Sequence, residues 1–185
     1  MVTRRGALAT LGVFGAWVLF PRAASASVSR ALSVAELTRA SRSVLLGEPV
    51  EAYSQWETVG QRRRIVTFTR VLVSEGVLGE TESEVMVHTL GGRVGDIGQI
   101  VHGEAALKLH EPSLLFLQDS SQGITRVTAM AQGHYRMLPD GQGLLRMSPS
   151  PRLGTLLPGK SVAAVRALKG RTFPEARSII VQARP

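Results

Sequence analysis

Two stretches decide the fold class of this chain: VLLGEPVEAYSQW at residues 44–56 and IVTFTRVLVS at residues 65–74. Both are rich in residue types that favour strands, and the first also alternates apolar and polar side chains. The polar segment 58–63 between them predicts a turn, so we expect the two strands to form a hairpin. Gly47 and Pro49 predict a bulge or bend, which is typical of a strand that curls into a barrel.

Further strand patterns follow along the chain. The predicted strands are residues 84–90, 105–109, 114–117 and 124–131. Pro139, Asp140 and Gly141 form a strong turn signal, which predicts a hairpin over residues 137–147. Short strands separated by turn signals every ~8–12 residues indicate a small barrel or sandwich. Their number fits best an open five-stranded barrel of the oligonucleotide/oligosaccharide-binding (OB) type.

Both ends of the predicted barrel carry helix signals. Ser33 precedes Glu36 at the spacing of a capping box, which predicts a short helix that leads into the barrel. Near the other end, the apolar residues of segment 160–169 predict a helix that ends at Gly170. The predicted fold is therefore mainly β, with short helices flanking an open barrel.

The chain is predicted to consist of three parts. Residues 1–26 form an export signal, residues 27–147 form the β-barrel domain, and residues 148–185 form a proline-containing linker with a short helix and a tail. In that tail, residues 179–181 are expected to form a short strand.

The predicted export signal has the order of charges and apolar residues that secretory signals share. Arg4 and Arg5 precede an apolar run at residues 7–20. Small residues suited to cleavage follow: Ala24, Ala26 and Ser27. The arginine pair resembles a twin-arginine signal, and the general secretory route stays open because the bulky residues usual after the pair are absent. We expect an exported protein, periplasmic or extracellular.

Charge and composition exclude several functions. The net charge of +8 falls to +5 without residues 1–26, because 19 basic and 14 acidic residues remain. With nine aromatic residues and dispersed basic ones, apart from Arg62–Arg64, no nucleic-acid partner is expected. The absence of cysteine excludes disulfides, thiolate nucleophiles and cysteine-ligated zinc. No second apolar stretch is long enough to span a membrane.

The most unusual stretch is GGRVGDIGQIVHG at residues 91–103, with five glycines in thirteen residues. Such a segment predicts a long loop that needs positive φ angles or close backbone approach. We take this loop and its flanking strand ends as a candidate binding surface. Its candidate residues are Gly91, Gly92, Arg93, Gly95, Asp96, Gly98, Gln99, Gly103, Glu104, Gln132 and Gly133.

No sequence motif of catalysis is found. The chain lacks His-Glu-x-x-His, Gly-x-Ser-x-Gly, Ser-x-x-Lys and the phosphate-binding loop with its lysine. Asp96 is expected to cap a turn and Glu104 to accept a loop backbone N–H. The alternative is a metal-dependent or acid/base hydrolase with a site around Asp96, His102 and Glu104. A metal site formed by His88, His102 and Asp96 also stays open.

A resemblance covers residues 33–137. The motif VLLGEPV at 44–50, the strand 65–73 followed by Val77-Leu78-Gly79, and the strand 84–90 with its glycine loop resemble the netrin-like, TIMP-like barrels. The same layout resembles uncharacterised exported bacterial proteins. It implies an OB-type barrel and, as a partner, an exported protein such as a protease. TIMP-type inhibitors chelate zinc with an amino-terminal cysteine, which this chain lacks, so that mechanism does not transfer.

The sequence thus predicts an exported, non-enzymatic binding module that contacts a protein partner through the loop 91–103 and needs no cofactor. The hydrolase is the alternative. A structural component of the cell envelope, which would self-associate, is a third possibility.

Overall fold

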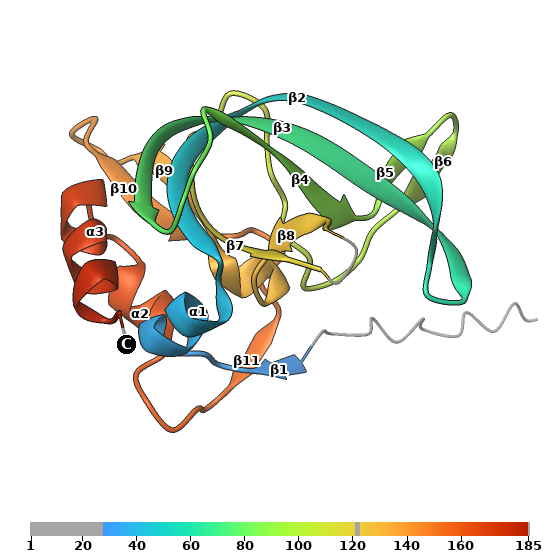
Figure 1. Ribbon diagram of the computed structural model, residues 1–185. Helices are drawn as coiled ribbons and strands as arrows, with labels where there is room; N and C mark the ends of the chain where they lie inside the picture. The colour runs from blue at the N-terminus through green and yellow to red at the C-terminus, as the bar shows by residue number, and fades with distance from the viewer. Residues whose placement is uncertain (1–27, 121–122, 185) are drawn as a thin grey trace, which may run out of the picture.

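The computed structural model describes residues 28–120 and 123–184. The predicted export signal, with Ala24, Ala26 and Ser27, lies outside the described residues. The described chain is mainly β, as predicted (Figure 1). Its strands are β1 (Val28–Arg30), β2 (Ser43–Val59), β3 (Arg62–Leu78), β4 (Glu84–Leu90), β5 (Gly92–Val94), β6 (Ile97–Gln99), β7 (Ser113–Asp119), β8 (Thr125–Val127), β9 (His134–Pro139), β10 (Leu145–Pro149) and β11 (Thr155–Leu157). Its helices are α1 (Val34–Ala40), the 3-10 helix η1 (Met130–Gly133), α2 (Ala164–Leu168) and α3 (Phe173–Gln182).

The first two predicted strands form a long antiparallel ribbon, β2 and β3, which curls across the molecule (Figure 1). The turn between them is shorter than predicted, since only residues 60–61 lie outside the strands. The pairing register shifts after Val44, directly before Gly47 and after Pro49, so the predicted bulges are confirmed. A Cβ atom at Gly47 would lie 2.6 Å from Val71 Cγ1, so the glycine lets the strands approach closely.

Five strands of a seven-stranded sheet pair in a ring. The ring runs from β2 through β3, β4, β8 and β7 back to β2. All of these pairings are antiparallel except β4 with β8, which is parallel and consists of the single pair His88–Arg126. Strands β9 and β10 extend the sheet beyond β7.

Strand β7 separates two apolar cores. Leu115 and Leu117 face the inside of the ring with Leu45, whereas Leu114 and Phe116 face the helices. All four of these β7 side chains are buried, which explains why their sequence is continuously apolar rather than alternating. The ring core consists of Leu45, Val71, Val87, Ala105, Leu115, Leu117 and Val127.

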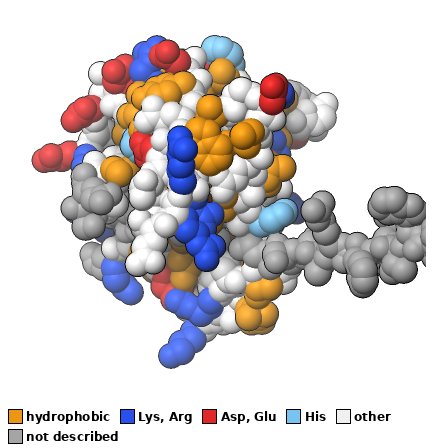
Figure 2. Space-filling view, turned by 90° about the vertical axis from the view of Figure 1, so that its right-hand side faces the viewer, with side chains coloured by type: hydrophobic (Ala, Val, Ile, Leu, Met, Phe, Trp, Pro, Cys, Tyr) orange, Lys and Arg blue, Asp and Glu red, His pale blue; other side chains and the backbone are white. Residues whose placement is uncertain are grey.

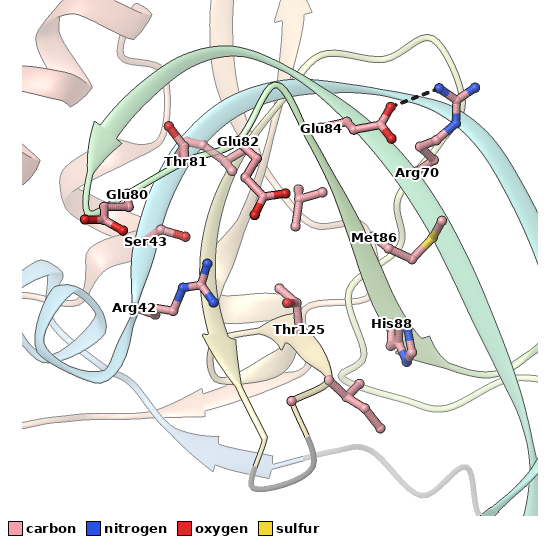
Figure 3. Close-up of a pocket in the computed structure, with 14 residues that line it drawn as sticks. Arg42, Ser43, Arg70, Glu80, Thr81, Glu82, Glu84, Met86, His88 and Thr125 are labelled. Carbon is pink, nitrogen blue, oxygen red and sulfur yellow. Dashed lines mark hydrogen bonds and ion pairs between the residues drawn. The ribbon is translucent and has the colours of Figure 1, made fainter.

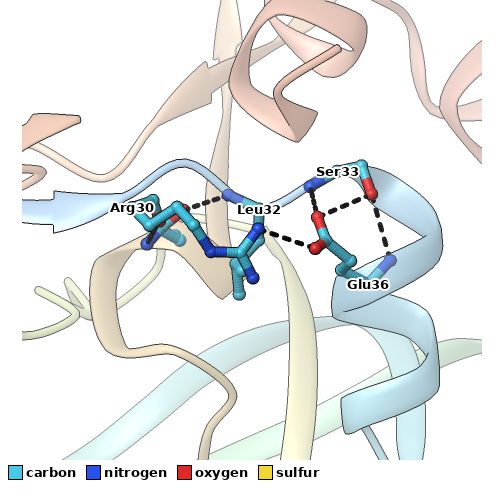
Figure 4. Close-up of polar contacts among 5 residues, drawn as sticks. Arg30, Leu32, Ser33 and Glu36 are labelled. Atoms are coloured by element: carbon cyan, nitrogen blue, oxygen red, sulfur yellow. Dashed lines mark hydrogen bonds and ion pairs between the residues drawn. The ribbon is translucent and has the colours of Figure 1, made fainter. Parts of the chain in front are cut away.

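The predicted capping box at the start of α1 is confirmed (Figure 4). Glu36 Oε2 accepts the Ser33 N–H at 2.8 Å, and Ser33 Oγ accepts the Glu36 N–H at 3.3 Å. The Arg30 guanidinium adds an ion pair at 2.8 Å. Together these bonds lower the pKa of Glu36 to about 2, with the Ser33 backbone N–H the largest cause.

The predicted tail is a helix. Residues 173–182 form α3, so the strand expected at 179–181 is wrong. Ala176 and Ile180 are fully buried in the core that also holds Leu37 and Phe116. The segment after residue 147 therefore packs onto the sheet, and the helices gather at one end of it (Figure 1).

Two other predicted strands are corrected. Residues 105–109 form no strand, and residues 124–131 contain only the short β8, followed by η1. The hairpin at Pro139–Gly141 is confirmed as β9 and β10. Among the described residues, no helix combines the length and the apolar character that crossing a membrane requires.

Candidate functional site

The glycine-rich segment 91–103 is a short hairpin rather than a plain loop. Strands β5 and β6 pair antiparallel, and Gly95 and Asp96 form the two-residue turn between them. Gly95 has φ +58°, and a glycine in the first of two turn positions suits such a hairpin. The hairpin lies beside the β2–β3 ribbon, away from the helices (Figure 1).

Hydrogen bonds to the ribbon fix the base of the hairpin. The Ile65 N–H donates to Gln99 Oε1 at 2.7 Å, and Thr67 Oγ1 donates to the Gly91 carbonyl at 2.7 Å. Gly92 stands against Ser54 and Thr67, so closely that a Cβ atom would overlap both hydroxyl groups. Of the candidate binding residues, Gly91, Gly92 and Gln99 therefore hold the hairpin in place.

The rest of the hairpin is directed at solvent. Arg93, Gly95, Asp96 and Gly98 are exposed, and a Cβ atom at either of these two glycines would meet no atom within 4 Å. Arg93 Nε donates to the Gly95 carbonyl at 3.0 Å. These four residues are the part of the predicted surface that a partner can reach.

Gln132 and Gly133 belong to the interior scaffold. Gln132 Oε1 accepts the Leu32 N–H at 2.9 Å, and its Nε2 donates to the Arg30 carbonyl at 3.1 Å, which ties η1 to the segment before α1. Gly133 passes so close to the Thr128 carbonyl that a Cβ atom would overlap it. Both residues organise the chain rather than present a surface.

Glu104 is buried, and both of its carboxylate oxygens accept backbone hydrogen bonds. Oε2 accepts from the Leu90 N–H at 3.2 Å and Oε1 from the Ala105 N–H at 3.0 Å. The predicted role, a carboxylate that holds a loop backbone N–H, is confirmed. Burial raises the pKa of Glu104 and outweighs these hydrogen bonds. The neighbouring Gly103 carbonyl accepts the Ala131 N–H at 2.9 Å.

The hydrolase alternative requires Asp96, His102 and Glu104 to act together. Asp96 lies in the exposed hairpin turn, His102 is exposed, and Glu104 is buried beneath β4. Within residues 28–120 and 123–184, no group of three or more His, Asp or Glu side chains is arranged to hold a metal ion. This holds equally for the set of His88, His102 and Asp96.

Glu104 instead shares a cavity of about 240 Å³, the Glu104 cavity, with His88 and Arg126. Burial is the main cause that lowers the pKa of His88. Ala129 and Met130 line the same cavity and have φ angles of 51° and 58°, a conformation that costs non-glycine residues free energy. The cavity thus brings together two ionisable groups whose pKa values burial shifts toward the neutral form.

The sequence does not reveal this arrangement. Arg126 is one arginine in a short strand, and Ala129 and Met130 carry no signal of positive φ. Arg126 lies opposite His88 only because β8 pairs with β4 where the ring closes. The sequence signal that pointed to this cavity was Glu104 itself, an acidic residue between a glycine and an apolar run.

The raised pKa of Glu104 predicts a pH dependence. Because the folded-state pKa lies above the unfolded value, the stability linked to Glu104 is present below about pH 4.5 and is lost as the pH rises through the folded pKa. Glu104→Gln removes this titration, so urea midpoints measured from pH 4 to pH 8 should decline less in the variant than in the wild type. Asp96→Asn is the matched control and should follow the wild type. Parallel profiles for wild type and Glu104→Gln would contradict the assignment.

Comparison of the chain with protein-family models, curated proteins and solved structures found no match in any of the three sets.

Proposed function

We propose that this protein is an exported, non-enzymatic binding module with an OB-type ring, and that its β5–β6 hairpin contacts a protein partner. The observation that carries the proposal is the exposure of two large aliphatic side chains there. Ile97 is 56% exposed and Ile100 is 68% exposed. The resemblance to TIMP-like barrels suggests an exported protease as the kind of partner.

The OB-type assignment is supported by the order of pairing. Five strands close in a ring, with the fifth inserted between the third and the fourth and parallel to the third. A partly open five-stranded barrel is the OB-type architecture. Export is supported by the order of charged, apolar and small residues in segment 1–26.

The hairpin is suited to recognition because its base is rigid. The bonds of Gln99 to Ile65 and of Gly91 to Thr67 hold it against the ribbon. A rigid surface loses little conformational entropy when it binds, so more of the contact free energy appears as affinity. The exposed isoleucine of β6 then meets a partner in a fixed position.

Arginine and tryptophan side chains lie at the same end of the molecule. Arg62, Arg63 and Arg64 begin β3, and the Arg63 guanidinium lies 5.3 Å from the Trp56 ring centre. Figure 2 faces this end and shows hydrophobic side chains gathered beside Lys and Arg side chains. Protein interfaces are enriched in tryptophan and arginine, so this surface has the composition of one.

The test uses point changes, because deleting segment 92–102 would also remove the bond from Gln99 to Ile65. The full chain captures partners from the exported protein fraction, and the captured partner is purified and titrated. The double change Ile97→Ser with Ile100→Ser should weaken its binding by roughly 10- to 100-fold, the effect of losing two central contacts. Val162→Ser, at a residue 67% exposed on another segment, is the control. A double variant that captures the same partner with unchanged affinity would contradict the proposal.

A second candidate is acid/base chemistry in the Glu104 cavity. It is favoured by one observation, the burial of Glu104 in a cavity that His88 also lines and that two residues in left-handed conformation border. Ionisable groups whose pKa is shifted by burial in a cavity are candidates for catalysis. The test of this second function is the pH profile of Glu104→Gln described above. The acid/base function is rejected if the profile shows that Glu104 does not titrate above its ordinary range.

A further inference from the structure

Strand β4 has a free edge. Its pairing with β3 covers every residue from Glu84 to Leu90, whereas its pairing with β8 consists of His88 alone. Between Glu84 and Val87, no strand among the described residues pairs with the edge that faces β8. The ring is therefore open at this point.

The hydrogen bonds at the end of β4 show which residues face the free edge. The Gly91 N–H donates to the Ile65 carbonyl on β3, whereas the Leu90 N–H donates to Glu104 on the opposite side. Successive residues of an antiparallel strand direct their backbone groups to alternate sides. Because the β3–β4 register has no bulge, Met86 and Glu84 share the orientation of Leu90. Their N–H and C=O groups point away from β3.

A cavity of about 430 Å³, the β4 slot, lies along this edge (Figure 3). It is bounded by β4, by residues 123–125 at the start of β8, and by the start of β2. Figure 3 shows Met86 on β4, with Glu80 and Glu82 on the connection that precedes it and Arg42 across the slot. An open edge beside a slot is the setting in which a peptide adds as a further strand.

The charges that remain unpaired in the slot are negative. Arg42 is bound to Asp119, and Arg70 is bound to Glu84 at 3.3 Å and to a further acid on β2. Glu80 and Glu82 make no hydrogen bond or ion pair within the described chain. A second copy of β4 would bring its own acidic residues against these two, so charge disfavours self-pairing and favours a basic segment.

We propose that the β4 slot binds an extended peptide segment that carries lysine or arginine. The main chain of the peptide pairs with Met86 and Glu84 as a strand next to β4. Its basic side chains reach Glu80 and Glu82. This site is separate from the β5–β6 hairpin and goes beyond the function proposed above.

The experiment uses the full chain labelled with ¹⁵N and a blocked nine-residue peptide of alternating valine and lysine. Binding should slow amide exchange at Met86 and Glu84 by about tenfold or more, because those N–H groups become hydrogen-bonded. The double change Glu80→Gln with Glu82→Gln should weaken binding by about five- to tenfold, as expected for two exposed ion pairs. Glu57→Gln, at an acidic residue outside the slot, is the control and should leave binding unchanged.

Two further peptides separate strand pairing from simple charge attraction. A peptide with glutamate in place of lysine should not bind, and a lysine peptide N-methylated at every residue, which has no N–H left on either edge, should lose the protection at Met86 and Glu84. The proposal is overturned if the valine–lysine peptide leaves both amides unprotected, if the glutamate peptide binds equally, or if N-methylation has no effect. The double change at Ile97 and Ile100 should leave peptide binding intact, so failure of the hairpin proposal is distinguishable from failure of this one.

Discussion

Lowering the pH from 7 to 4 is expected to destabilise the wild-type protein by about 3 kcal/mol more than the variant His134→Gln. Burial lowers the pKa of His134 to about 3, far below its ordinary value of 6.5. A histidine with a lowered folded-state pKa contributes stability that is present above the unfolded pKa and is lost as the pH falls toward the folded one. The stability that His134 contributes is therefore lost between about pH 6.5 and pH 3.

The surroundings of His134 explain why its charged form is costly. The ring is fully buried, and its Nε2 lies 3.1 Å from Ser113 Oγ. Because the single Ser113 hydroxyl hydrogen donates to the Glu111 carbonyl at 3.2 Å, Nε2 carries the proton and Nδ1 is the free acceptor. Nδ1 has no hydrogen-bond partner within the described chain. Protonation would place an unpaired N–H and a charge there, beside Arg136.

The measurement is the free energy of unfolding in urea at pH 7, 5.5 and 4 for both proteins. His102→Gln, at an exposed histidine, is the matched control and should follow the wild type. The opposite pH dependence of Glu104 limits the net change in the wild type, so the difference between wild type and His134→Gln is the decisive quantity. Equal losses in both proteins on acidification would show that His134 is not the group responsible.

Local signals explain what the sequence could predict. The bulges at Gly47 and Pro49, the capping box of Ser33 and Glu36, and the turn at Pro139–Gly141 each depend on a few neighbouring residues. All are confirmed, because no distant contact is needed to favour them. The strand at β7 was also predicted, from its apolar residues. Its burial on both faces was not predicted, because that depends on the two cores that pack against it.

The error at α3 has a physical reason. Ile179, Ile180 and Val181 form a β-branched run, which favours a strand by composition. The stronger signal lay earlier, where Thr172 and Glu175 form a capping box with a proline in the first turn. Burial of Ile180 against the sheet then stabilises the helix. Tertiary packing thus overrode the intrinsic preference of the run.

The candidate sites were predictable only in part. The role of Glu104 followed from its place between a glycine and an apolar segment, whereas Asp96 lies in a turn as expected but accepts no hydrogen bond within the described chain that would cap it. The Glu104 cavity and the β4 slot both depend on how β8 meets β4, and that parallel contact involves one residue pair. No periodicity within either strand contains this information. Ring closure is a long-range property of the fold, and the chemistry at its opening is not visible along the chain.

Replacement of Gly92 by alanine is expected to destabilise the protein by about 2–4 kcal/mol, the combined cost of a strained backbone and an overfilled contact. Gly92 has φ +131°, a conformation that residues with a Cβ atom rarely adopt. A Cβ atom there would also overlap Ser54 Oγ and Thr67 Oγ1, which hydrogen-bond to each other at 2.8 Å. Thr67 in turn holds the Gly91 carbonyl, so the base of the hairpin would be displaced.

Gly95→Asn is the matched control, because it changes a glycine of positive φ in the same hairpin. Gly95 has φ +58°, which asparagine tolerates, and no atom lies within 4 Å of its missing Cβ. Its effect should stay within about 0.5 kcal/mol. Urea unfolding of the two variants at pH 7 measures the difference, and equal stability would mean that Gly92 is not confined by the ribbon.

Comparing Gly92→Ala with the serine changes at Ile97 and Ile100 distinguishes residues that hold the hairpin in place from residues that contact the partner. A loss of partner capture in Gly92→Ala would accompany a loss of stability, since the hairpin base holds β5 and β6 against the ribbon. Ile97 and Ile100 are exposed, so serine at both positions should reduce capture while the free energy of unfolding stays within about 0.5 kcal/mol of the wild type. If Gly92→Ala retained full stability yet lost capture, the glycine itself would be a contact residue, and the division between a fixed base and a binding tip would have to be abandoned.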